Sequence, residues 1–219
     1  MATRGLGKYS EQCLDDGTMA MPGLNHYGYI VGSCFDAGSS FAAAVEKGRV
    51  FSVANQAGVT SAAGLSAAEP VLTLYNPAGS GVTGRLWYAG AAMLVANTAA
   101  ATVWLTAGTN TVGATVTGTL TTAHRCLKFG GITPASQGNR IVALLAATLP
   151  AAPVAIDVLG AGLTGAITTL TPSLPALAKC YYGALLIQPG TNISIQTGTA
   201  SGTSGLVCSY VWEEHALIA

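Results

Sequence analysis

The feature that most constrains the fold is a series of short apolar segments, separated by glycine and proline turns, that begins near Pro70. Short strands at this spacing, without long helical patterns between them, predict an all-β sandwich or barrel. For Ile141–Ala147 a short buried helix has the same composition, so both readings stay open. The expected strands are Val71–Tyr75, Arg85–Val95, Ala101–Leu105, Val112–Leu120, Cys126–Phe129, Ile141–Ala147, Val154–Leu159, Ala166–Leu170, Tyr181–Ile187, Asn192–Thr197 and Leu206–Glu213.

The last segment has the clearest alternation. Even-numbered residues from Leu206 to Trp212 are apolar and share one face, and odd-numbered residues from Val207 to Glu213 share the other. The second face is only half polar. Such a face either meets another subunit or belongs to a strand that is buried on both sides.

Residues 1–66 do not show this strand pattern, and we expect an extended N-terminal arm with a sandwich domain over residues 67–219. One short helix is expected at Ser40–Lys47, because serine precedes an alanine-rich run and Gly48 follows it. A helix of one or two turns needs packing to be stable.

A G-x-G-x-x-G pattern, Gly79–Gly84, follows an expected strand and must be tested as a dinucleotide fingerprint. The next residues include Trp87 and Tyr88 and favour a strand instead of the helix that a pyrophosphate site requires. No acidic residue lies between Glu69 and Asp157 to bind a ribose. We therefore interpret these glycines as a turn between strands, and we expect no cofactor.

Three stretches resemble small structural proteins of tailed-phage virions: Gly48–Thr60, Leu74–Gly81 and Tyr210–Glu214. The resemblance is to capsid decoration or cement proteins, or related tail components. It implies a jelly-roll-like antiparallel β-sandwich with an extended N-terminal arm, and a homotrimer that binds the major capsid protein. The implied location is the capsid surface of the virion, after synthesis in the host bacterial cytoplasm. The alternative is a tail-fibre, spike or baseplate component that binds a host surface glycan.

Composition agrees with an assembly component. Charged residues make up 8% of the chain, against roughly 25% in ordinary soluble domains, and nine basic side chains balance nine acidic ones. A lone soluble subunit usually has a more charged surface, so we expect much of this surface to be covered by protein. The absence of a basic run argues against nucleic acid. Ile141–Leu149 is too short to span a membrane, and residues 1–8 lack the apolar core of a secretory signal.

The sequence favours no enzymatic chemistry. Beyond Glu69 the carboxylates are Asp157, Glu213 and Glu214, and we interpret them as solvated or interface groups. Neither the histidines nor the cysteines have metal-ligand spacing, so we expect no metal, no catalytic residue and mostly buried, reduced thiols. The residues concerned are His26, His124, His215, Cys13, Cys34, Cys126, Cys180 and Cys208.

Aromatic side chains are the candidates for an assembly interface, because such residues anchor interfaces. Tryptophans are also frequent in cores, and three of them on one surface would suit glycan stacking. The candidates are Tyr27, Tyr29, Phe35, Trp87, Trp104 and Trp212.

Overall fold

The computed structural model describes residues 41–42, 44–94, 101–109, 115–121, 125–128, 139–162, 177–200 and 205–216. Ala44–Ala219 forms one compact unit, and Met1–Ala43 is grouped apart from it. Within the described ranges the chain forms strands β1 (Val50–Ala54), β2 (Leu72–Asn76), β3 (Val82–Met93), β4 (Ala101–Thr109), β5 (Thr117–Leu120), β6 (Arg125–Cys126), β7 (Val142–Thr148), β8 (Val154–Gly162), β9 (Leu177–Ile187), β10 (Thr191–Thr197) and β11 (Leu206–Ala216).

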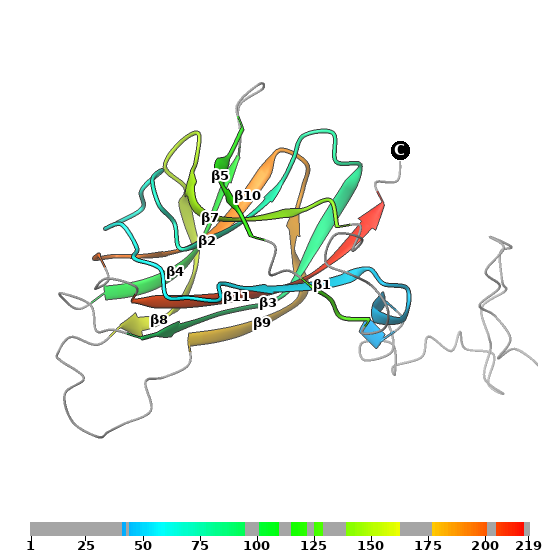
Figure 1. Cartoon of the computed structure of the whole chain (residues 1–219), viewed down its shortest axis with the longest axis horizontal. Helices are drawn as coiled ribbons and strands as arrows, with labels where there is room; N and C mark the ends of the chain where they lie inside the picture. Colours follow the sequence, from blue (N-terminus) through cyan, green and yellow to red (C-terminus); the bar gives the residue numbers. More distant parts are fainter. Residues whose placement is uncertain are drawn as a thin grey trace, which may run out of the picture. The chain divides into compact units, whose positions relative to one another are not determined.

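These strands form two antiparallel sheets that pack as a sandwich, so the expected fold class is confirmed (Figure 1). One sheet has the order β6-β1-β11-β3-β9, and the other has the order β5-β7-β2-β10-β4-β8. If the three strands β5, β6 and β7 are set aside, the other eight pair in a nested order. The first pairs with the last (β1–β11), and the next pairs are β2–β10, β3–β9 and β4–β8. This nested pairing, distributed alternately over two sheets, is the jelly-roll arrangement.

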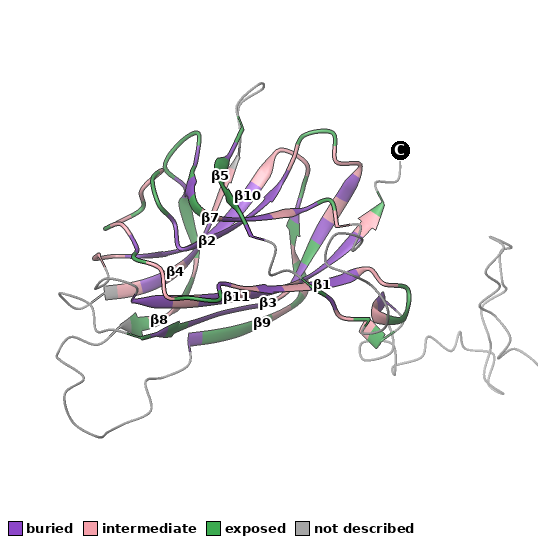
Figure 2. Ribbon diagram, viewed as in Figure 1, coloured by how far each residue is buried: buried purple, intermediate pink, exposed green. Residues whose placement is uncertain are grey.

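The main core lies between the two sheets. Trp212 on β11 is fully buried and stacks on Phe51 of β1, with ring centroids 5.7 Å apart. The hydroxyl of Tyr210 donates a hydrogen bond across the sandwich to the carbonyl oxygen of Leu72, at 3.1 Å. The alternation predicted for the last strand is confirmed, because the even-numbered residues from Leu206 to Trp212 are buried (Figure 2).

A smaller apolar cluster explains why every residue of β2 is buried. Leu144 and Ala147 of β7 pack with Tyr75, Val116 and Leu149. Burial of both faces of β2 follows from this second cluster, because the first cluster already covers its inward side.

Gly79 and Gly81 lie in the turn from β2 into β3, as the sequence predicts, whereas Gly84 lies within β3. Gly79 and Gly81 have φ angles of 79° and 73°, which residues other than glycine rarely adopt. The Asn76 side-chain amide closes the turn, donating 2.8 Å hydrogen bonds to the carbonyl oxygens of Val82 and Ile187. The turn therefore has a structural explanation that involves no ligand.

The expected boundary after residue 66 needs correction. Val50–Ala54, placed in the arm by sequence, is strand β1 and pairs with both β11 and β6 inside the five-stranded sheet. It is short, and the residues after it do not alternate, so local pattern did not reveal it. The helical turn before it ends as expected at Gly48, whose N–H donates to Val45 O at 2.9 Å.

The other expected strands overlap observed ones, with Ile141–Ala147 resolved as strand β7 and not a helix. Several bounds differ: β5 starts at Thr117 where Val112 was expected, β9 starts at Leu177, four residues before the expected Tyr181, and β4 ends at Thr109, four residues after the expected Leu105. The expected strand Ala166–Leu170 lies outside the described residues.

Candidate interaction surface

The most unusual surface of the described chain is formed by β8 and β9, each the last strand of its sheet. Eight large hydrophobic side chains are exposed in the described residues, and five of them lie on these two strands. We call this surface the β8–β9 edge, defined by Val154, Ile156, Val158, Tyr182 and Leu186. Figure 2 shows β9 as largely exposed along its length. Exposed apolar groups gathered on one surface of a soluble domain indicate an interaction site.

A polar network joins the two strands. Lys179 Nζ on β9 lies 2.7 Å from Asp157 Oδ2 on β8, and the Tyr181 hydroxyl donates to the same oxygen at 2.8 Å. The hydrogen bond from Lys179 holds the pKa of Asp157 below its usual value, although burial acts in the opposite direction. Burial, followed by the contact with Asp157, raises the pKa of Tyr181. The charges of Lys179 and Asp157 thus cancel locally.

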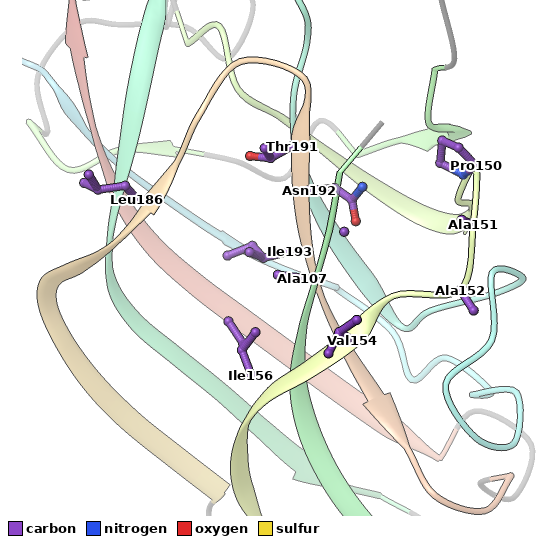
Figure 3. A pocket seen from close by; sticks show the side chains of 11 residues that line it. Ala107, Pro150, Ala151, Ala152, Val154, Ile156, Leu186, Thr191, Asn192 and Ile193 are labelled. Carbon is purple, nitrogen blue, oxygen red and sulfur yellow. The ribbon is translucent and has the colours of Figure 1, made fainter. Parts of the chain in front are cut away.

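Between the two strands, the edge is hollowed by a cavity of about 380 Å³. Figure 3 shows Leu186 of β9 on one side of the cavity and Val154 and Ile156 of β8 on the other. Ala107 of β4 and Ile193 of β10 form its floor, next to the main core. An apolar hollow of this size can accept a large side chain.

Both edge strands are irregular. Tyr182 and Gly183 on β9 have φ angles of 51° and 79°, and the pairing of β9 with β3 shifts register beside them. The pairing of β8 with β4 shifts register twice. Irregular edge strands are poor templates for an added strand. Recognition at the β8–β9 edge therefore depends on side chains, and Tyr182 is the most prominent of them at 76% exposed.

The aromatic residues expected at an interface differ in where the structure places them. Tyr27, Tyr29 and Phe35 lie outside the described residues. The assignment of Trp212 to an interface is wrong, because its side chain is fully buried in the core.

The other two tryptophans are partly exposed, but on different sheets. Trp87 is on β3 of the five-stranded sheet, and its Nε1 lies 3.4 Å from Glu213 Oε2. Trp104 is on β4 of the six-stranded sheet. Since Trp212 is buried between the sheets, the three tryptophans do not form a common stacking surface.

Glu213 and Glu214 point to opposite faces of β11, as expected. Their interpretation as solvated or interface groups needs correction, because both are buried within the chain itself. Glu213 Oε1 lies 3.2 Å from Arg49 Nη2 and 2.7 Å from His215 Nε2. This cluster connects the start of β1 to the end of β11, and we assign it a structural role.

Glu214 acts as an internal hydrogen-bond acceptor. Its carboxylate accepts 2.9 Å bonds from the backbone N–H groups of Arg140 and Ile141, and a 3.2 Å bond from Trp212 Nε1. These bonds fix the entry of the chain into β7. Sequence reasoning missed this role, because the backbone donors, at Arg140 and Ile141, lie more than 70 residues away.

The remaining cysteines and histidines in the described ranges do not gather into a site. Among the described cysteines, Cys126 and Cys208 are buried and Cys180 is exposed on β9. Cys13, Cys34, His26 and His124 lie outside the described ranges. In the part of the chain that the structure describes, no three His, Cys, Asp or Glu residues are placed to hold a metal ion. The described residues also contain no helix with the length and apolarity to span a membrane.

Comparison with protein-family models, curated proteins and solved structures found no match. The chain is defined by its fold and surface as a jelly-roll sandwich with an exposed apolar edge. The apolar residues Val154, Ile156 and Val158 were visible in the sequence as a strand signal. The register shifts of β8 place Val154 beside Ala107 and Val158 beside Trp104, on opposite faces of the strand, and nothing in the sequence signal shows that all three are exposed.

Proposed function

We propose that this protein is a structural protein of a phage virion, a decoration or cement protein that binds the major capsid protein and stabilises the shell. The observation that carries the proposal is the exposed β8–β9 edge in a chain with only 8% charged residues. Such a surface is costly to leave in water and favours a subunit that is covered by other protein. The jelly roll is also an architecture used repeatedly in viral capsid domains.

The segments that carry the resemblance to phage virion proteins support a structural role. Gly48–Thr60 contains β1, and Tyr210–Glu214 belongs to β11; these two strands pair at the centre of the five-stranded sheet. Leu74–Gly81 contains the end of β2 and the glycine turn. The shared residues therefore build the sandwich and do not form a reaction centre.

The mechanism is stabilisation by binding. Burial of apolar surface contributes roughly 25 cal/mol per Å², and a ligand that binds only the assembled shell shifts its stability by mass action. Repetition over many capsid sites would raise the resistance of the shell to heat and internal pressure. This mechanism uses no turnover, cofactor or metal.

The alternative function, a tail-fibre, spike or baseplate component that binds a host glycan, has less support. A stacking platform made of three tryptophans would favour it, and the three side chains lie on two different sheets and in the core. Jelly rolls also occur in lectin domains, so the fold itself is compatible with either function.

Cryo-electron microscopy of phage particles that carry this chain would test the proposal. We expect many copies at regular positions on the head. A few copies on the tail, together with selective binding on a glycan array, would establish the alternative. Absence of the chain from purified particles would contradict both functions. As an independent readout, particles stripped of this protein should lose DNA at lower temperature and recover when the purified protein is added.

A further inference from the structure

We propose that the β8–β9 edge is the contact between copies of this chain, with Tyr182 of one copy entering the hollow between Val154 and Leu186 of the next. This inference goes beyond the proposed function, which concerns binding to the capsid protein, and its argument and its test do not involve capsids. The occupant of the hollow is therefore a second copy of the same protein.

Charge favours a second copy over other partners. Lys179 and Asp157 are the charged residues of β8 and β9, and they neutralise each other at 2.7 Å. Arg85 of β3, which is exposed and pairs in register with Leu186, adds one positive charge beside β9, so the edge offers little to attract a strongly charged partner such as a nucleic acid. The whole chain has nine basic and nine acidic residues, so two copies approach without net repulsion. A mainly apolar surface is matched by another such surface, and each copy supplies one.

Shape favours self-association as well, because the edge has both a projection and a hollow. Tyr182 is 76% exposed and projects from β9. Leu186, on the same strand, lines the cavity of about 380 Å³. The two positions are four residues apart, on a stretch of β9 that bulges between Cys180, which pairs with Tyr88, and Leu185, which pairs with Leu86. Each copy thus presents both halves of the contact, and an aromatic side chain buries roughly 150–250 Å² when it enters such a site.

The irregular backbone makes this contact selective. Positive φ angles at Tyr182 and Gly183 interrupt the edge of β9 and turn the tyrosine outward. A continuous ladder with an added strand is therefore disfavoured, while insertion of a side chain is not. Association through side chains ends with a defined number of copies when the contact closes on itself.

The test is the molar mass of the full-length protein in solution, measured by light scattering over a concentration series. Wild type is expected to be an oligomer. Leu186→Lys and Tyr182→Asn should each weaken association at least about tenfold. Lysine places a charge in the hollow, and asparagine removes the aromatic ring while tolerating the φ angle of 51° at this position.

A matched control exists on the opposite side of the sandwich. Leu120 of β5 is 54% exposed, the same fraction as Leu186, and β5 is also the last strand of its sheet. Leu120→Lys should leave the molar mass unchanged. A monomeric wild type, or equal effects of Leu120→Lys and Leu186→Lys, would overturn the proposal.

Hydrogen exchange of the wild-type protein gives a second test that does not depend on folded variants. Amides of β8 and of Tyr182–Leu186 should become more protected as concentration rises, whereas those of β5 should not. Protection that is independent of concentration in β8 and β9 would contradict the contact. Absence of the protein from capsids would not contradict the contact between copies. Failure of this inference and failure of the proposed function are therefore distinguishable.

Discussion

Lys179 Nζ lies 2.7 Å from Asp157 Oδ2, and this ion pair joins the last strand of the five-stranded sheet to the last strand of the six-stranded sheet. The jelly-roll order makes β8 and β9 edge strands of opposite sheets. No strand pairing connects them in the described chain, so side chains link the two sheets at this side of the sandwich. The same pair also removes net charge from the β8–β9 edge.

We expect the ion pair to contribute only modestly to stability. The Lys179 side chain is half exposed, and exposed pairs contribute up to about 1 kcal/mol. Asp157→Asn, Lys179→Met and the double variant form a cycle whose coupling energy can be measured by urea unfolding. A coupling energy well above about 1 kcal/mol would contradict this expectation.

The pH dependence of this contribution has a defined sign. The pKa of Asp157 is lowered in the folded protein relative to its ordinary value of 3.8, so the pair stabilises the fold at neutral pH. That stabilisation is lost as pH falls below about 3.8 and through the folded pKa. The melting temperatures of wild type and Asp157→Asn should therefore differ at pH 7 and converge in acid. A constant difference would contradict the assignment.

Trp212 should behave as a core residue. Trp212→Ala is expected to reduce the free energy of unfolding by about 3–5 kcal/mol, because it removes a fully buried ring that stacks on Phe51. Trp87→Ala, at a partly exposed position, should cost clearly less. Chemical denaturation of both variants measures the difference. Similar losses for the two would mean that Trp212 is not the central packing residue.

Glu214→Ala should destabilise the start of β7. The substitution leaves the N–H groups of Arg140 and Ile141 without their carboxylate acceptor, at a cost of roughly 1–3 kcal/mol for a buried group. Glu46→Ala, at an exposed position, is the control and should change stability by less than about 0.5 kcal/mol. Hydrogen exchange should show faster exchange at Arg140 and Ile141 in Glu214→Ala alone.

Truncation should show where the sandwich begins. Deletion of residues 1–40 leaves β1 intact, and the product should fold with wild-type β-sheet content. Deletion of residues 1–66 removes β1, which lies between β6 and β11 and buries Val50, Phe51 and Val53. This second product should aggregate or show no cooperative melting by circular dichroism. A stable fold without residues 1–66 would restore the boundary that the sequence suggested.

The local features of this protein could be predicted well. The alternation from Leu206 to Trp212 predicted both the strand and its buried face, because side chains alternate along any strand. Asn76 and the glycines after it predicted a turn, since these residues favour the backbone angles that a turn requires. The recurrence of such segments was enough to predict an all-β sandwich or barrel, and the resemblance favoured the sandwich.

The long-range pairings could not be predicted in this way. Nothing local to Val50–Ala54 indicates that it pairs with β11, more than 150 residues later. The burial of Glu214 likewise depends on Arg140 and Ile141, which approach it only in the folded chain.

The sequence by itself determined where strands and turns form, and that the chain has too little charge to cover an ordinary soluble surface. Only the tertiary structure decided which apolar strands are covered: β2 is buried on both faces, while β8 leaves Val154, Ile156 and Val158 exposed. The physical reason is that periodicity depends on neighbours along the chain, whereas burial depends on which distant strands pack on top.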